Sequence, residues 1–139
     1  ASAMKAIEGL ATGWRSTGAW TLAQMLEHAA QSVEYSLRGF PEMKSGLFRA
    51  TVGRAAFAVF DSRGQMDHGL AEAIPGAPPI AAGAALDAAI QRAMKSLRDF
   101  EAHSGALAPH FAYGALDKAQ FTRAHLMHLA NHWAEVVRA

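Results

Sequence analysis

The chain has 139 residues, a length that predicts one domain over residues 1–139, and 51% of them are hydrophobic, which argues against disorder. The net charge is +1 without a run of like charges, so the charge pattern gives no reason to expect a nucleic-acid partner or an anionic membrane surface. The absence of cysteine excludes a disulfide framework, a thiolate metal site and a cysteine nucleophile.

Helical periodicity begins near the N-terminus. A short helical segment is predicted over residues 3–12, ahead of a bundle over about residues 20–138. The first long helix is predicted over Thr21–Arg38, because its apolar residues recur three and four positions apart. Thr21 is its expected N-cap, and Gly39 ends it.

Three more long helices follow, and no segment indicates a strand. They are predicted over Phe48–Asp61, Ala84–His103 and Asp117–Arg138. Asp117 is the expected N-cap of the last helix. Arg49 and Arg54 are interpreted as surface charges, with a role as anion ligands as the alternative.

A long crossover loop joins the second and third of these long helices. Its segment IPGAPPI carries prolines at positions 75, 78 and 79, which prevent a helix. A structureless loop of about twenty residues in a compact domain is usually functional or wraps another element. Four long helices with one long crossover predict an all-α fold, a four-helix bundle.

Two features bear on location. No stretch approaches the roughly eighteen apolar residues of a membrane span, so no membrane association is expected. The chain begins Ala-Ser-Ala, which indicates a processed precursor or a trimmed boundary. A cytoplasmic location is favoured, and export after removal of a leader is the alternative.

Seven histidines are the unusual feature of the composition, and three lie in the last predicted helix. At about 100° per residue, His125, His128 and His132 fall within a ~60° arc. The arc lies on the same side as Phe121 and Leu129, so the three rings are expected to point inward. Buried imidazoles need polar partners, and a metal ion is the simplest partner that they can share.

Spacing allows two metal-binding pairs. Histidines three or four residues apart are neighbours on a helix, so His125/His128 or His128/His132 can chelate one ion. His125 and His132 are about 10 Å apart along the axis, too far to share an ion. Leu129 stands where the HExxH motif has its glutamate, so no zincin-type general base follows the first histidine.

A two-histidine site needs a third ligand, and His28 is the best candidate. It lies roughly 100–180° from the apolar stripe of the first long helix, on a face with Gln24, Gln31 and Ser32. That face suits the wall of a wet cavity, and plain solvent-exposed surface is the alternative. An open three-histidine site keeps positions for water or substrate, as catalytic metal sites do.

The remaining histidines fit simpler interpretations. A single half-buried histidine on a helix is usually a hydrogen-bonded core residue. His68 and His103 have no partner pattern and are interpreted as solvated. His110, in PHFAYG, is expected either to reach the mouth of the site with Tyr113 or to cap its own loop.

Four segments carry a family resemblance: WTLAQMLEHAAQSVEYS, GFPEMKSGLFRATVG, IPGAP and PHFAYGALDKAQFTRAHLMHLANHW. They resemble the DinB-like superfamily of metal-binding bundles, within a bacterial branch of unknown function. The resemblance covers about Trp14 to Val137. Its most specific element is a histidine in the first long helix followed by HxxxH in the last.

The resemblance implies a DinB-like four-helix bundle with one divalent ion held by three histidines. The general affinity order favours copper, nickel and zinc over manganese, and zinc or nickel is the expected ion. Matched onto this sequence, the ligands are His28, His128 and His132. His125 is then an additional histidine beside the ligands or at the mouth of the site. Relatives include S-transferases that use low-molecular-weight thiols and metal-dependent hydrolases; in a chain without cysteine, any thiolate must come from a cosubstrate.

Three functions follow as hypotheses. The first is a metal-dependent S-transferase or hydrolase acting on a small-molecule substrate, with His125, His110 or Tyr113 as proton donor or acceptor. The second is a non-catalytic bundle that binds a metal or small ligand. No Asp or Glu that could act as a general base lies within one helical turn of His128, and the nearest is Glu135. The third is an interaction domain with core histidines. A homodimer is also expected from the apolar, alanine-rich helices.

Overall fold

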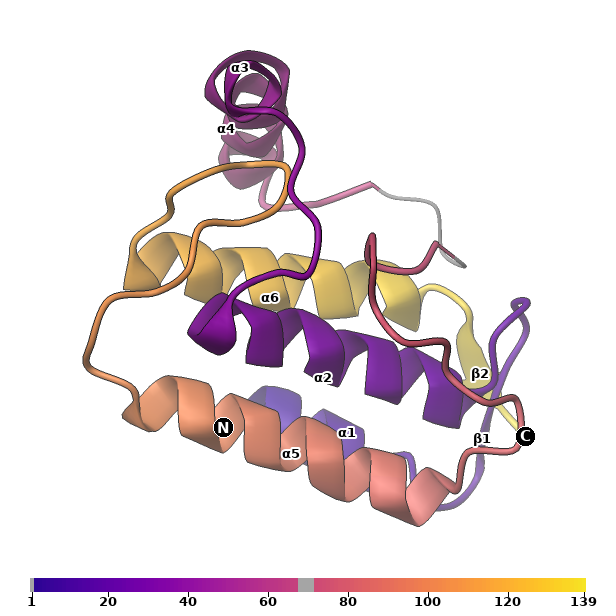
Figure 1. The fold of residues 1–139 in the computed structure, drawn as a ribbon. Coiled ribbons are helices and arrows are strands. Elements are labelled where there is room, and N and C mark those ends of the chain that lie inside the picture. The colour runs from indigo at the N-terminus through magenta and orange to yellow at the C-terminus, as the bar shows by residue number, and fades with distance from the viewer. Residues whose placement is uncertain (1, 68–71) are drawn as a thin grey trace.

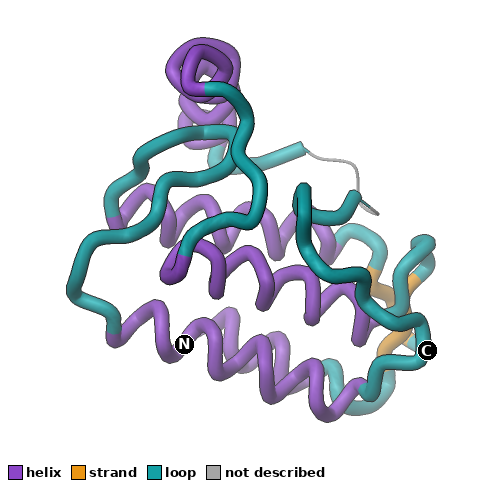
Figure 2. The backbone as a smooth tube through the Cα atoms, viewed as in Figure 1, coloured by secondary structure: helices purple, strands orange, loops and turns teal. Residues whose placement is uncertain are grey.

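The computed structural model describes residues 2–67 and 72–139 and is mostly helical, as the predicted all-α class requires (Figures 1 and 2). His68, interpreted as solvated, lies outside the described residues. In chain order the elements are α1 (Ser2–Gly9), β1 (Trp14–Ser16), α2 (Leu22–Arg38), α3 (Gly46–Phe48), the π-helical turn η1 (Arg49–Gly53), α4 (Arg54–Arg63), α5 (Leu86–Ala102), α6 (Lys118–Trp133) and β2 (Val136–Arg138).

Capping boxes fix where α2 and α6 begin. The Thr21 side chain accepts the Gln24 backbone N–H, and the Gln24 side chain accepts the Thr21 N–H in return. Asp117 and Gln120 make the same pair of bonds at the start of α6. Both predicted N-caps are therefore confirmed, and each capping box fixes the residue at which its helix begins.

The end of α6 differs from the prediction. The helix stops at Trp133, and residues Val136–Arg138 form β2, which pairs antiparallel with β1. The expected helix to Arg138 and the expected absence of strands were wrong. Three-residue strands are too short to show an alternating pattern, and their pairing depends on the opposite end of the chain.

The apolar core consists of two clusters along α2. In the first, α2 packs against α5, and α1 packs against α5 as well; Leu26, Ala30 and Ala89 are completely buried there. Figure 1 shows α2, α5 and α6 as neighbouring helices. The second cluster surrounds Phe121 of α6 and includes Phe57 of α4. Arg92 of α5 also bonds two glutamates of α2, Glu27 and Glu34.

The predicted helix over Phe48–Asp61 is divided into α3, η1 and α4. Figure 1 shows these elements beyond the layer formed by α2, α5 and α6. A Cβ atom on Gly53 would lie 1.7 Å from the carbonyl oxygen of Ala112, so η1 packs directly on the loop before α6. Arg54, interpreted as a surface charge, is exposed and donates to the carbonyl of Ala115 in the same loop.

The crossover segment before α5 lies over the polar face of α2. The Gln24 side chain donates to the carbonyl of Ile80 at 3.4 Å, and Gln31 donates to that of Pro78 at 3.2 Å. Residues 72–85 contain no helix, as the prolines predicted. No helix within the described ranges is long and apolar enough to span a bilayer.

Replacing Gly53 with alanine should disturb the packing of η1 against the loop that contains Ala112. The added Cβ overlaps a backbone oxygen, which cannot move as a flexible side chain can. We expect Gly53→Ala to lower the free energy of unfolding by about 1–3 kcal/mol in urea titrations. Gly9→Ala is the matched control, since nothing lies within 4 Å of its Cβ position, and it should be neutral or slightly stabilising. A Gly53→Ala variant as stable as the wild type would contradict this packing.

Candidate metal centre

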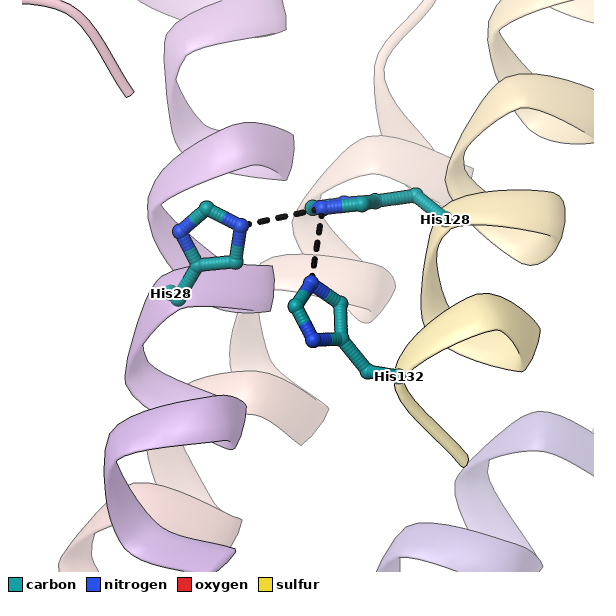
Figure 3. Close-up of side chains that lie close together, drawn as sticks. All are labelled: His28, His128 and His132. Carbon is teal, nitrogen blue, oxygen red and sulfur yellow. Dashed lines mark hydrogen bonds between the residues drawn. The ribbon is translucent and has the colours of Figure 1, made fainter. Parts of the chain in front are cut away.

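Three histidines from two helices face one another (Figure 3). His28 comes from the middle of α2, and His128 and His132 from the last two turns of α6. The Nε2 atom of His128 lies 3.0 Å from Nε2 of His28 and 3.1 Å from Nε2 of His132. A ligand atom from each ring lies within 4.8 Å of the other two, so the three side chains could hold one ion.

Hydrogen bonding alone accounts poorly for this arrangement. A neutral imidazole nitrogen offers either one N–H or one lone pair, directed in the ring plane. Nε2 of His128 can therefore make one linear hydrogen bond, whereas two ring nitrogens approach it. A cation between them would serve all three lone pairs. Nitrogens around a tetrahedral zinc at Zn–N distances of ~2.0–2.1 Å are about 3.3 Å apart, close to the separations seen here. The three residues thus fit a divalent ion.

The surface alternative for His28 was wrong, because this ring is only 4% exposed. The glutamines that bind the crossover segment, Gln24 and Gln31, lie one helical turn before and after His28 on the same face. The Trp20 ring covers the site as well, with its centroid 4.8 Å from that of His28 and a stacked contact to His132. Nothing in the sequence pattern indicated Trp20.

A cavity of about 280 Å³ adjoins two of the three histidines. Its wall includes His28 and His128, the loop over residues 110–113 and the crossover residues 72–75. This volume is near the lower end for small-molecule sites. Two charged residues at the cavity, Lys44 and Glu72, are exposed and were not singled out in the sequence.

His125 lies in the cavity wall but outside the group of three. Its Nε2 is 3.0 Å from the Ser36 hydroxyl, which itself donates to the Val33 carbonyl, so the Nε2–H of His125 donates to Ser36. The Phe121 ring stacks on it. Burial lowers the pKa of His125 to about 3, so the ring is neutral at neutral pH.

His110 and Tyr113 line the cavity together. Nδ1 of His110 accepts the backbone N–H groups of Ala112 and Tyr113, both at 3.1 Å, which is the loop-capping role considered above. The two rings stack with centroids 4.2 Å apart. Burial raises the pKa of Tyr113, so its phenol stays protonated at neutral pH.

His103, interpreted as solvated, is half-buried and remote from the three histidines in sequence. Its Nε2 lies 3.0 Å from the carbonyl oxygen of Ala106, within its own loop. It therefore offers a histidine outside the candidate site for comparison.

Comparison with known proteins identifies a family. The family model described as "Protein of unknown function (DUF1569)" matches residues 1–139. A search of curated proteins and a search of solved structures each found no significant match.

The buried His125 should make stability depend on pH. Its pKa is lowered from 6.5 to about 3, so only the unfolded chain binds a proton as the pH falls below about 6.5. The stability that the neutral His125 ring contributes should be fully present at neutral pH and decrease towards pH 3. The free energy of unfolding should fall by about 2 kcal/mol between pH 7 and pH 5. Urea unfolding of the wild type and His125→Gln at both pH values measures this difference. An NMR titration of the His125 ring near pH 6.5 would contradict it.

Proposed function

We propose that this chain, which belongs to the DUF1569 family, binds one divalent metal ion through His28, His128 and His132 and is a metal-dependent enzyme for a small molecule. The observation that carries the proposal is the approach of two imidazole nitrogens to Nε2 of His128. The adjoining cavity of about 280 Å³ supports a reaction over simple metal storage, because it gives a molecule access to two of the three ligands. Zinc and nickel are the expected ions.

The proposal includes the finer description of the fold and its relatives. We infer a four-helix bundle of the DinB-like type, in which α4 is the helix that departs from the bundle axis. The neighbouring α2, α5 and α6 support this inference, as does the ion pair of Asp61 in α4 with Arg123 in α6. The position of the long crossover, directly before α5, agrees with the same description.

A divalent ion held by three neutral imidazoles keeps its full charge and lowers the pKa of a water or thiol bound to it towards ~7. The chain's own residues provide the surroundings. Trp20 and the crossover segment cover His28, and the aromatic loop over residues 110–113 contributes to the cavity wall. With no cysteine in the chain, an S-transferase reaction would take its thiol from a cosubstrate.

Among the three residues predicted for proton transfer, His110 and Tyr113 suit the role best. Nδ1 of His110 accepts two backbone amides, so proton exchange by this ring runs through Nε2. The protonated Tyr113 phenol can donate but, with its raised pKa, is a poor base at neutral pH. His125 has a lowered pKa and donates its Nε2–H to Ser36, so its role is to support the wall.

One observation favours a non-catalytic metal- or ligand-binding bundle as the alternative. Glu72 is the single carboxylate among the described residues of the cavity wall, and it is exposed. A buried general base of the carboxylate type is therefore absent from this part of the chain. Zinc-loaded protein that turns over neither thiol-transfer nor ester or amide substrates would favour the alternative.

Removing one histidine should remove the metal. Wild-type protein purified without a histidine tag should hold about one zinc or nickel ion per chain by elemental analysis, and His128→Ala should hold none, since one helix can no longer provide a chelating pair. EDTA should lower the melting temperature of the wild type and leave His128→Ala unchanged.

The matched control is His103→Ala, which removes a histidine outside the site and should keep the metal. Circular dichroism establishes that each variant is folded. Wild-type protein without metal after exposure to zinc and nickel, or equal metal content in all three proteins, would overturn the proposal.

A further inference from the structure

One serine hydroxyl in the cavity wall makes no hydrogen bond with the part of the chain that the structure describes. Ser32 lies four residues after His28, on the same face of α2, and is 7% exposed. It lines the cavity together with His28 and His128. Its hydroxyl makes no hydrogen bond with the described residues and is not fully enclosed by them.

Other buried helical serines show the contrast. Ser36 donates to the carbonyl of Val33 at 2.6 Å, and Ser96 donates to that of Ala93 at 2.8 Å. Both hydroxyls bond to their own helix, as serines in helix interiors commonly do. Ser32 does not use this option, and its hydroxyl is instead available to a molecule in the cavity.

The other buried polar groups of the wall already have defined bonds. Nε2 of His125 donates to Ser36, and Nδ1 of His110 accepts two backbone amides. The charged side chains Lys44 and Glu72 are exposed. The inner part of the cavity thus combines apolar walls, the histidine nitrogens and the hydroxyl of Ser32.

We propose that Ser32 is a specificity-determining residue that hydrogen-bonds a neutral polar group of the bound substrate. This inference rests on the proposed metal site. Ser32 lies one helical turn after His28 in the same cavity wall, so the substrate carries a metal-ligating group and, within a few bonds of it, a hydroxyl or amide. The substrate class is therefore a small bifunctional molecule, and the second group is uncharged because no charged side chain lies in the buried wall to pair with an ion.

Paired hydroxamates test this inference, because hydroxamates ligate zinc directly. The probes are 3-hydroxypropanohydroxamate and 4-hydroxybutanohydroxamate, each compared with the hydroxamate that lacks the hydroxyl. Calorimetric titration of zinc-loaded wild type should give one hydroxylated probe an advantage of about three- to tenfold in Kd, the value of one hydrogen bond. In Ser32→Ala the advantage should disappear while the unhydroxylated probes bind as before.

Ser96→Ala is the matched control, since it removes a buried helical hydroxyl outside the cavity wall and should keep the advantage. Equal binding of each pair to the wild type, an advantage that persists in Ser32→Ala, or no hydroxamate binding to zinc-loaded protein would overturn the role of Ser32. Zinc content is measured on every sample. Failure to hold zinc would instead overturn the metal proposal, so the two failures are distinguishable.

Discussion

The close approach of three imidazoles from α2 and α6 is the constraint on which the rest of the site depends. Nε2 of His128 has ring nitrogens at 3.0 and 3.1 Å, and such an arrangement is costly without a shared partner. Each ring is placed by a helix whose start is fixed by a capping box. The apolar residues of α2 and α6 pack in the core clusters, and this packing turns the histidine-bearing faces of the two helices towards each other.

The two faces of α2 contact different parts of the protein. One side packs against α5 through small and branched apolar residues and provides a rigid support. The other side carries His28 between polar residues, and the crossover segment covers it through the side chains of Gln24 and Gln31. A polar face of this kind would ordinarily be solvated. Here it becomes the wall of a cavity, because backbone carbonyls of the proline-rich crossover segment accept hydrogen bonds from the side-chain amides of Gln24 and Gln31. The Ser32 hydroxyl is left to bind a ligand in the cavity.

Local signals in the sequence predicted the parts of the fold that local physics determines. The starts of α2 and α6 and the absence of helix in residues 72–85 depend on caps and prolines within a few residues. The sequence could not decide whether His28 is buried, because its cover comes from Trp20 and from residues about fifty positions away. For the same reason the spacing could not decide whether His125/His128 or His128/His132 is the metal-binding pair. The structure groups His132 with His28 and His128 and turns His125 towards Ser36, a partner on another helix. The β1–β2 pair, which joins the two ends of the chain, was missed because neither strand has a pattern of its own.

The proposed metal site can be tested most directly by X-ray absorption spectroscopy of zinc-loaded protein after desalting. The signal reports which atoms surround the ion and at what distance. We expect three imidazole nitrogens at about 2.0–2.1 Å together with oxygen from solvent, since the cavity gives access to the ion. A signal with one imidazole or none, or the loss of zinc on desalting, would contradict a site built from His28, His128 and His132.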